Sequence, residues 1–265
     1  MKAIVIAPRG KMGKVIIAAA QQFPDLEIIA SVGPAGRDYI GKDTGLISGL
    51  GEEIGAPVVD DLESVIGNCD VIIDFSTREL SLAVLGAALK HRKALVCGTT
   101  GLSKEEQKRF KEAAGTIPVL YAANTSRLVG YMSKILEFCA KSFGEKADIE
   151  IIEMHDRYKL DAPSGTSREM GAHMAEAMGK NLGDLAVYGR KGAGARQKGE
   201  IGYHSLRAGS MPSSHIVMFG FMGERLEIAH HTYNWESFGR GACEAALYLR
   251  GKPAGLYTVK DAFGQ

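Results

Sequence analysis

The sequence has few cysteines, no long apolar run and no excess of either charge. Its four cysteines are widely spaced and form no C-x-x-C pair, which argues against structural zinc. No apolar run approaches the roughly 20 residues needed to cross a bilayer, and no secretory signal follows Met1. With 32 Lys and Arg against 31 Asp and Glu, the composition indicates neither a nucleic-acid nor an anionic-membrane partner. We therefore expect a reduced, cytoplasmic, soluble protein.

The chain of 265 residues, 45% hydrophobic, is long enough for two modest domains or one large one. Strands that are apolar throughout and alternate with helices indicate a parallel sheet covered on both faces. The first half follows this pattern, with strands over 2–7, 26–32, 71–75, 94–97 and 119–122 and helices over 15–23, 79–91 and 104–114. This predicts an α/β fold whose N-terminal part is a Rossmann-like, doubly wound sheet.

A glycine turn follows the first expected strand and favours a dinucleotide. Gly10, Lys11, Met12 and Gly13 occupy the position where glycines let the backbone approach a pyrophosphate at the start of a helix. Ala7 stands where the first glycine of such a loop usually lies. A plain strand-to-helix turn is the alternative interpretation.

The residues after the second expected strand favour NADPH, although NADH is possible. Enzymes that prefer NAD usually place an acid there, roughly 20 residues past the glycines, to hold the ribose 2′-hydroxyl. Residues 30–34 contain no acid, whereas Arg9, Lys11 and Arg37 are available for a 2′-phosphate. Solvated surface charge is the alternative interpretation of these three.

Two further turns follow expected strands at the edge where open α/β sheets bind ligands. One is D-F-S-T, containing Phe75 and Ser76, and the other is C-G-T-T-G, containing Gly98, Thr99 and Thr100. Both are expected to line the cofactor site. Helix capping by their serine and threonine residues is the alternative.

The regular alternation of strands and helices ends after Asn124. The pattern that follows predicts a mixed sheet: a helix over 128–143, a strand over 148–154, a helix over 167–179, a glycine-rich basic loop over 189–199 and three consecutive strand-like runs. We expect residues 1–126 and 237–265 to form a dinucleotide-binding domain. Residues 127–236 are expected to form a mixed α/β domain for substrate binding and oligomerisation.

The connection from Glu153 to Thr166 carries most of the chemistry. Within residues 155–166 it contains an imidazole, an ammonium, two carboxylates, two hydroxyls and a glycine. Pro163 followed by Ser-Gly-Thr fits a loop that closes on a helix N-terminus, where an anionic group binds well. A polar capping loop without chemistry is the bland alternative.

These motifs resemble those of one known family. The motifs are G-K-M-G, D-F-S-T, C-G-T-T-G, A-A-N at residues 122–124, E-x-H-x-x-x-K-x-D-A-P-S-G-T and R-A-G at residues 207–209. Their order and spacing resemble those of the 4-hydroxy-tetrahydrodipicolinate (dihydrodipicolinate) reductase family over essentially the whole chain. The resemblance implies NADPH- or NADH-dependent reduction of a cyclic imine dicarboxylate, in the route to diaminopimelate and lysine. It also implies a homotetramer.

The same resemblance implies roles for individual residues. His155 would be the general acid, and Lys159 would help to supply the proton and hold a carboxylate. Substrate would further contact Ser164, Gly165 and Thr166 at the helix N-terminus. The cofactor would be lined by Arg9, Gly10, Lys11, Met12, Gly13, Phe75, Ser76, Gly98, Thr99, Thr100, Ala123 and Asn124.

The sequence departs from the family pattern at two positions near the expected substrate. Asp156 replaces the second of two adjacent histidines, and Trp235 replaces a substrate-binding arginine. Both are therefore taken as candidate substrate contacts. Losing a charge-assisted contact can change substrate preference by orders of magnitude, so a paralogue that reduces another imine, such as a monocarboxylate stacked on Trp235, is an alternative. A non-catalytic NADPH-binding regulatory protein is another.

Overall fold

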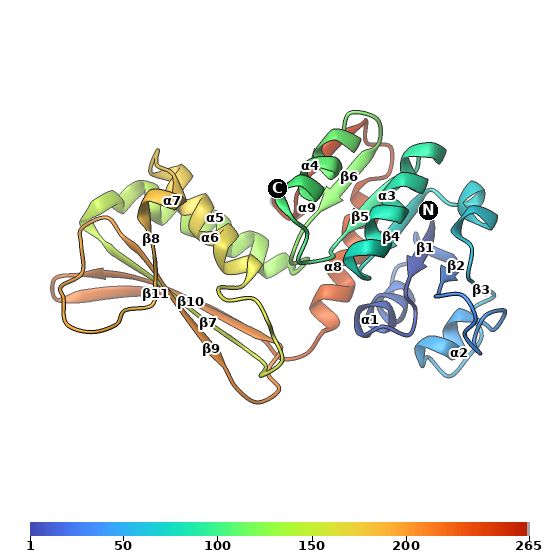
Figure 1. The fold of residues 1–265 in the computed structure, drawn as a ribbon, viewed down its shortest axis with the longest axis horizontal. Helices are drawn as coiled ribbons and strands as arrows, with labels where there is room; N and C mark the ends of the chain where they lie inside the picture. The colour runs from blue at the N-terminus through green and yellow to red at the C-terminus, as the bar shows by residue number, and fades with distance from the viewer. Residues whose placement is uncertain (264–265) are drawn as a thin grey trace. The chain divides into compact units, whose positions relative to one another are not determined.

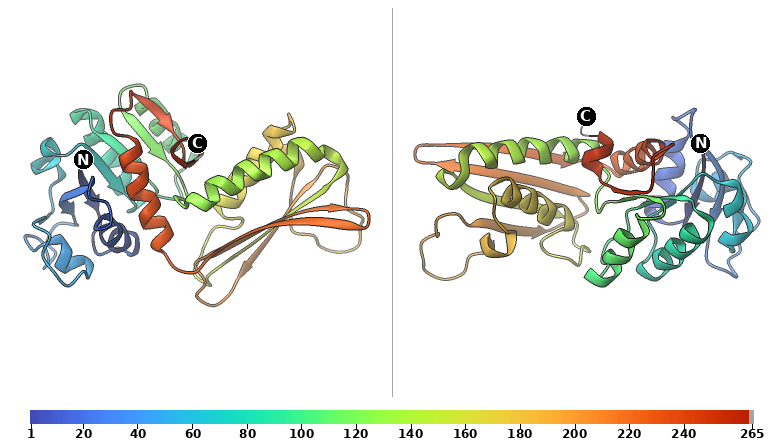
Figure 2. Two further views of the ribbon diagram at one scale, coloured as in Figure 1. Left: turned by 180° about the vertical axis from the view of Figure 1, so that it is seen from behind. Right: turned by 90° about the horizontal axis from the view of Figure 1, so that it is seen from above.

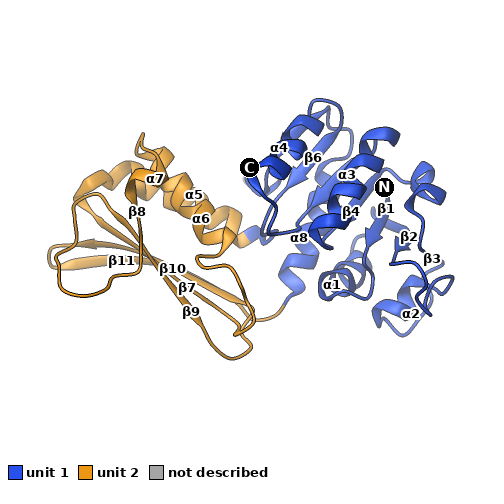
Figure 3. Ribbon diagram, viewed as in Figure 1, with its two compact units in different colours: residues 1–127, 235–263, 265 blue, residues 128–234, 264 orange. Residues whose placement is uncertain are grey.

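The computed structural model describes residues 1–263 and divides them into two units (Figure 3). Unit 1 comprises Met1–Arg127 and Trp235–Phe263, and unit 2 comprises Leu128–Asn234. Residues 264–265, which the sequence assigned to the first domain, lie outside the described residues. No helix within residues 1–263 is both long and apolar enough to span a membrane.

Unit 1 is built on a seven-stranded sheet in which every pairing is parallel (Figure 1). The strand order is β12-β6-β5-β4-β1-β2-β3. This confirms the predicted Rossmann-like fold. The strands are β1 (Lys2–Ile6), β2 (Glu27–Val32), β3 (Val58–Val59), β4 (Val71–Asp74), β5 (Ala94–Cys97), β6 (Pro118–Tyr121) and β12 (Gly255–Tyr257).

Helices cover both faces of this sheet because its strands alternate buried apolar side chains between two cores. Helices α1 (Lys11–Ala20) and α8 (Glu236–Tyr248) pack on one core, and α3 (Arg78–His91) and α4 (Lys104–Ala113) pack on the other. The shorter helical segments of the unit are α2 (Thr44–Ser48), η1 (Leu62–Ser64), η2 (Ile66–Asn68) and α9 (Val259–Phe263).

Helices α1 and α8 touch through their backbones. A Cβ atom on Gly239 of α8 would lie 2.5 Å from the carbonyl oxygen of Val15 in α1. Only glycine permits this approach, which fixes the start of α8 against the start of α1.

Unit 2 contains a five-stranded mixed sheet in the order β11-β10-β7-β9-β8. Strands β7 and β9 are parallel, whereas β10 runs antiparallel to both β7 and β11. This confirms the expected mixed sheet. The strands are β7 (Asp148–His155), β8 (Ala186–Tyr188), β9 (Ile201–Arg207), β10 (Ser213–Phe221) and β11 (Glu224–Thr232).

One face of this sheet is covered by α5 (Arg127–Phe143) and α6 (Gly165–Ala177), as Figure 2 shows. Leu136 of α5 and Met170 and Met174 of α6 are buried in the core against β7, β9 and β10. The remaining elements, η3 (Gly144–Lys146) and α7 (Leu182–Leu185), are short. No helix of the described chain covers the other face.

Candidate functional site

The expected cofactor residues of unit 1 gather at the carboxyl edge of the parallel sheet. Strands β6, β5, β4 and β1 are neighbours, so the segments that follow them lie side by side. The ligand-binding edge of an open α/β sheet is this one. It carries the glycine loop after β1, Phe75 and Ser76 after β4, Gly98, Thr99 and Thr100 after β5, and Ala123 and Asn124 after β6.

The glycine loop has the geometry that a pyrophosphate needs. A Cβ atom on Gly13 would lie 2.1 Å from the carbonyl oxygen of Ala7, so the loop folds directly onto the helix. Gly10 caps α1 without a side-chain hydrogen bond in the described chain, which leaves the N–H groups of the first turn facing outward. Ala7 adopts the left-handed conformation, with φ of 58°, that a glycine would adopt without strain. The loop therefore fits a dinucleotide.

The neighbouring turns are shaped by contacts within the unit. Gly98 lies under the Phe75 ring, since a Cβ atom there would come within 1.9 Å of it. Ser76 donates through its hydroxyl and its N–H to buried Asp74, and burial raises the pKa of Asp74. The Thr99 hydroxyl bonds to Ser81 at 2.7 Å. The Ser76 and Thr99 hydroxyls are thus already hydrogen-bonded, and the Phe75 ring, exposed Thr100 and the backbone remain for a ligand.

Two basic residues near the glycine loop each lie over an aromatic ring. The Arg9 guanidinium lies 5.1 Å from the centre of the Tyr39 ring and 3.6 Å from a carboxylate oxygen of Asp38. The Lys11 ammonium lies 3.8 Å from the centre of the Trp235 ring. Trp235, expected among the substrate contacts and in the second domain, thus belongs to unit 1 and lies against the glycine loop.

The expected catalytic groups of unit 2 lie on the helix-covered face of its sheet. Strand register places Glu153 of β7 opposite His215 of β10, and His215 opposite His230 of β11. In the next row, His155 of β7 is opposite Arg207 of β9. Residues from four strands therefore form one polar cluster at the edge of a hydrophobic core.

Glu153 is the hub of this cluster. Its carboxylate accepts a hydrogen bond of 2.5 Å from Nδ1 of His155 and a bidentate pair of hydrogen bonds from the Arg207 guanidinium, at 2.7 and 2.9 Å. It also accepts the N–H of Ser164 at 3.2 Å. Burial alone would raise the pKa of Glu153, but the hydrogen bonds from His155 and Arg207 lower it to about 2. An ionised carboxylate only accepts, so Nδ1 carries the hydrogen and Nε2 is the ring atom available to a ligand.

Lys159 forms a second polar corner at the start of α6. Its ammonium lies 2.7 Å from a carboxylate oxygen of Asp161, and the same carboxylate accepts the N–H of Gly165. Burial would raise the pKa of Asp161, but the contact with Lys159 and the backbone N–H groups lower it. This corner therefore already holds a carboxylate between an ammonium and a helix N-terminus.

Three other expected substrate residues have structural contacts. Asp156 accepts the N–H of Tyr158 at 2.8 Å and forms the turn that follows β7. Ser164 is buried and caps α6 by accepting the N–H of Ser167 at 3.1 Å. Thr166 is buried in the first turn of α6. These contacts position the loop.

Buried His215 should make the protein sensitive to mild acid. Burial, followed by the charges of His155 and His230, lowers its pKa from 6.5 to about 3. Below pH 6.5 the unfolded chain binds a proton here that the folded chain does not, so the free energy of unfolding should fall by up to about 1.4 kcal/mol per pH unit toward pH 3. Urea unfolding at pH 7.5, 6.5 and 5.5 measures this. His215→Asn should flatten the dependence and His231→Asn, on an exposed position, should not; an unchanged slope in His215→Asn would contradict the assignment.

Sequence reasoning missed the roles of Glu153, Arg207 and His215. Spacing could have found the first, because residues two apart on a strand share a face and E-x-H therefore pairs Glu153 with His155. Nothing in the sequence pairs Arg207 or His215 with Glu153. Both contacts depend on strand register.

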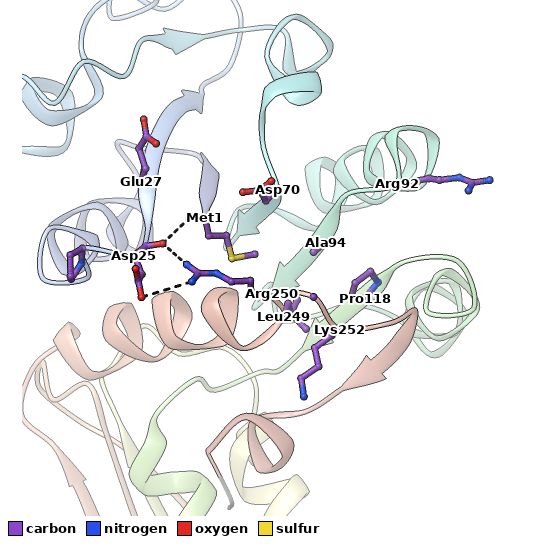
Figure 4. Close-up of a pocket in the computed structure, with 12 residues that line it drawn as sticks. Met1, Asp25, Glu27, Asp70, Arg92, Ala94, Pro118, Leu249, Arg250 and Lys252 are labelled. Carbon is purple, nitrogen blue, oxygen red and sulfur yellow. Dashed lines mark hydrogen bonds and ion pairs between the residues drawn. The ribbon is translucent and has the colours of Figure 1, made fainter.

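A hollow of about 700 Å³ lies at the opposite, amino edge of the unit 1 sheet (Figure 4). Arg250 and Asp25 pair with each other there, and the Arg92, Lys252 and Glu27 side chains point in different directions. Its charged groups do not converge on a common point, so we do not take it as a candidate site. Among residues 1–263, no group of three or more His, Cys, Asp or Glu side chains is arranged to hold a metal ion.

Comparisons with known families match both halves of the chain. Residues 1–125 match the model described as dihydrodipicolinate reductase, N-terminus, and residues 129–263 match dihydrodipicolinate reductase, C-terminus. A 4-hydroxy-tetrahydrodipicolinate reductase from Hahella chejuensis is 44% identical over 98% of this chain and 97% of its own. A 4-hydroxy-tetrahydrodipicolinate reductase from Burkholderia cenocepacia is 40% identical over 100% of this chain and 99% of its own.

Solved structures agree with these matches. A dipicolinate-bound dihydrodipicolinate reductase from Paenisporosarcina sp. TG-14 superposes with a TM-score of 0.74, at 25% identity over 97% of both chains. A GenD2 structure in complex with NAD superposes with a TM-score of 0.63 at 12% identity, over 99% of this chain and 90% of that one, and this shows a shared fold alone.

Proposed function

The chain belongs to the dihydrodipicolinate reductase family, and we propose that it reduces a cyclic imine dicarboxylate with NAD(P)H, the activity for which its relatives are named. It is an oxidoreductase of the diaminopimelate and lysine pathway. The alternatives, a paralogue with another imine and a non-catalytic regulator, are not favoured, because relatives at 40–44% identity match nearly the whole chain. The observation that carries the catalytic assignment is the bonded pair of Glu153 and His155, at the end of the strand that leads to Lys159.

A nicotinamide, when bound, would supply a hydride to the unsaturated imine ring. The ring nitrogen then needs a proton, and a positioned side-chain acid provides one. In our proposal Nε2 of His155 donates it, because Nδ1 is held by Glu153 and that carboxylate stabilises the imidazolium form. Lys159 assists and binds a substrate carboxylate.

The corner at Lys159 supports this carboxylate role. Asp161 occupies it in the described structure, with the ammonium and the N–H of Gly165 as its partners. A substrate carboxylate would take the same partners, together with the first turn of α6 at Thr166. The structural relative from Paenisporosarcina binds dipicolinate, which also carries two carboxylates.

Turnover of two imines tests the proposed substrate. Oxidation of NADPH would be followed with the cyclic imine dicarboxylate, generated freshly, and with Δ1-piperideine-2-carboxylate, which has one carboxylate. We expect a kcat/KM ratio of about 10- to 100-fold in favour of the dicarboxylate, the effect of one charge-assisted contact. Equal turnover of both would overturn the dicarboxylate assignment, and turnover of neither would overturn the function.

The finer cofactor proposal is that NADPH is preferred over NADH. Arg9 and Arg37 follow β1 and β2 and are exposed, as partners of a 2′-phosphate must be, and Asp38 lies 3.6 Å from Arg9 as the candidate acceptor for the ribose hydroxyl of NADH. Arg9→Ala should raise KM for NADPH about tenfold and change KM for NADH less than threefold. Asp38→Asn is the matched control and should not weaken NADPH. Equal losses for both cofactors in Arg9→Ala would contradict the proposal.

We also propose that copies of the chain assemble as a homotetramer through the open face of the unit 2 sheet. Register places Ile152, Met154, Ile216 and Met218 together on this face, and half-exposed Leu206 of β9 is opposite Met154. Light scattering should give four chains for the wild type and fewer for Ile216→Glu.

The four cysteines of the chain are buried free thiols, which fits a reducing compartment, and we propose that the reaction takes place in the cytoplasm.

A further inference from the structure

Trp235 is the only tryptophan of the sequence, and it belongs to unit 1, whereas the cluster around Glu153 belongs to unit 2. The Lys11 ammonium lies 3.8 Å from the centre of the indole ring, and the centre of the Phe238 ring lies 5.3 Å from it. An ammonium over the face of an indole is attracted by the ring's negative potential. This pair is therefore a defined contact of the glycine loop.

The contact is held in place by the backbone. Trp235 is the N-cap residue of α8, and Lys11 is the first residue of α1. The approach of Gly239 to Val15 locks these two helix starts together. The indole thus fixes a positive charge at the helix N-terminus that faces a pyrophosphate in our proposed function.

We propose that Trp235 is a cofactor-site residue that positions Lys11 for the pyrophosphate, rather than a substrate contact. This inference rests on the dinucleotide binding of the proposed function. It differs from the role of Arg9, because a pyrophosphate is common to both cofactors. Loss of the indole should weaken NADPH and NADH equally.

Calorimetric titration of NADPH and NADH into the full-length protein tests the proposal without turnover. Trp235→Ala and Lys11→Met should each raise both dissociation constants about three- to tenfold, the range of a cation–π contact. The double variant should have dissociation constants no higher than those of the more affected single variant, because both changes remove the same contact. Trp235→Phe, which keeps a ring, should lose less.

Two matched controls separate this contact from charge and from aromatic packing. Lys14→Met removes a lysine from the same helix, and Lys252→Met removes an ammonium that lies 4.3 Å from the Tyr248 ring elsewhere in the unit. Both should bind the cofactors as the wild type does. The cofactor-free emission of Trp235 should change in Lys11→Met and stay constant in both controls, which reports the contact even where a variant folds less stably.

The outcomes are distinct. Unchanged dissociation constants in Trp235→Ala, or additive losses in the double variant, would overturn the inference. A raised KM for the imine with unchanged cofactor binding would return Trp235 to the substrate site. No binding of either dinucleotide to the wild type would instead overturn the proposed function.

Discussion

Glu153→Gln should lower kcat about 10²-fold or more while changing KM for the imine only a few-fold. The carboxylate orients His155 through Nδ1 and stabilises its charged form, and a neutral amide does neither reliably. Steady-state kinetics measures both parameters.

The loss in Glu153→Gln should be smaller than that in His155→Gln, and the two should not add, because both act through the same imidazole. Glu150→Gln is the matched control. Glu150 also lies on β7 and is bonded to a histidine and two arginines, but on the open face of the sheet, so kcat per assembled enzyme should be unchanged. An equal loss in both variants would show that Glu153 acts only on stability.

Lys159→Met should lower kcat/KM on the order of 10³-fold, through both parameters. Removing a charged partner of the substrate carboxylate raises KM about 10- to 100-fold, and removing the assisting proton donor lowers kcat further. The same kinetic assay measures the two parts separately.

Lys159→Arg separates the two roles of this residue. A guanidinium binds a carboxylate but remains protonated, so KM should recover while kcat stays low. Lys146→Met, an exposed lysine of unit 2, should have no effect on either parameter. Full recovery of kcat in Lys159→Arg would exclude Lys159 as a proton source.

The local elements of this protein follow from its sequence because they depend on near neighbours. The apolar strand 94–97 matches β5, and the expected helix 79–91 matches α3 apart from its first residue. The short strands β3 and β12 were not predicted, because two or three residues carry no periodic signal. Helix α2, which has five residues and is capped by Asp43, was not predicted either.

The sequence by itself determined which segments we propose for the chemistry: the glycine turn and the loop from Glu153 to Thr166 are local patterns of backbone and side-chain type. Only the tertiary structure decided the partners. Arg207 and His215 meet Glu153 because strands far apart in the chain pair in one register, and a shift of one residue would turn both side chains to the opposite face. Trp235 meets Lys11 because two glycine-permitted helices pack closely, which no local pattern encodes.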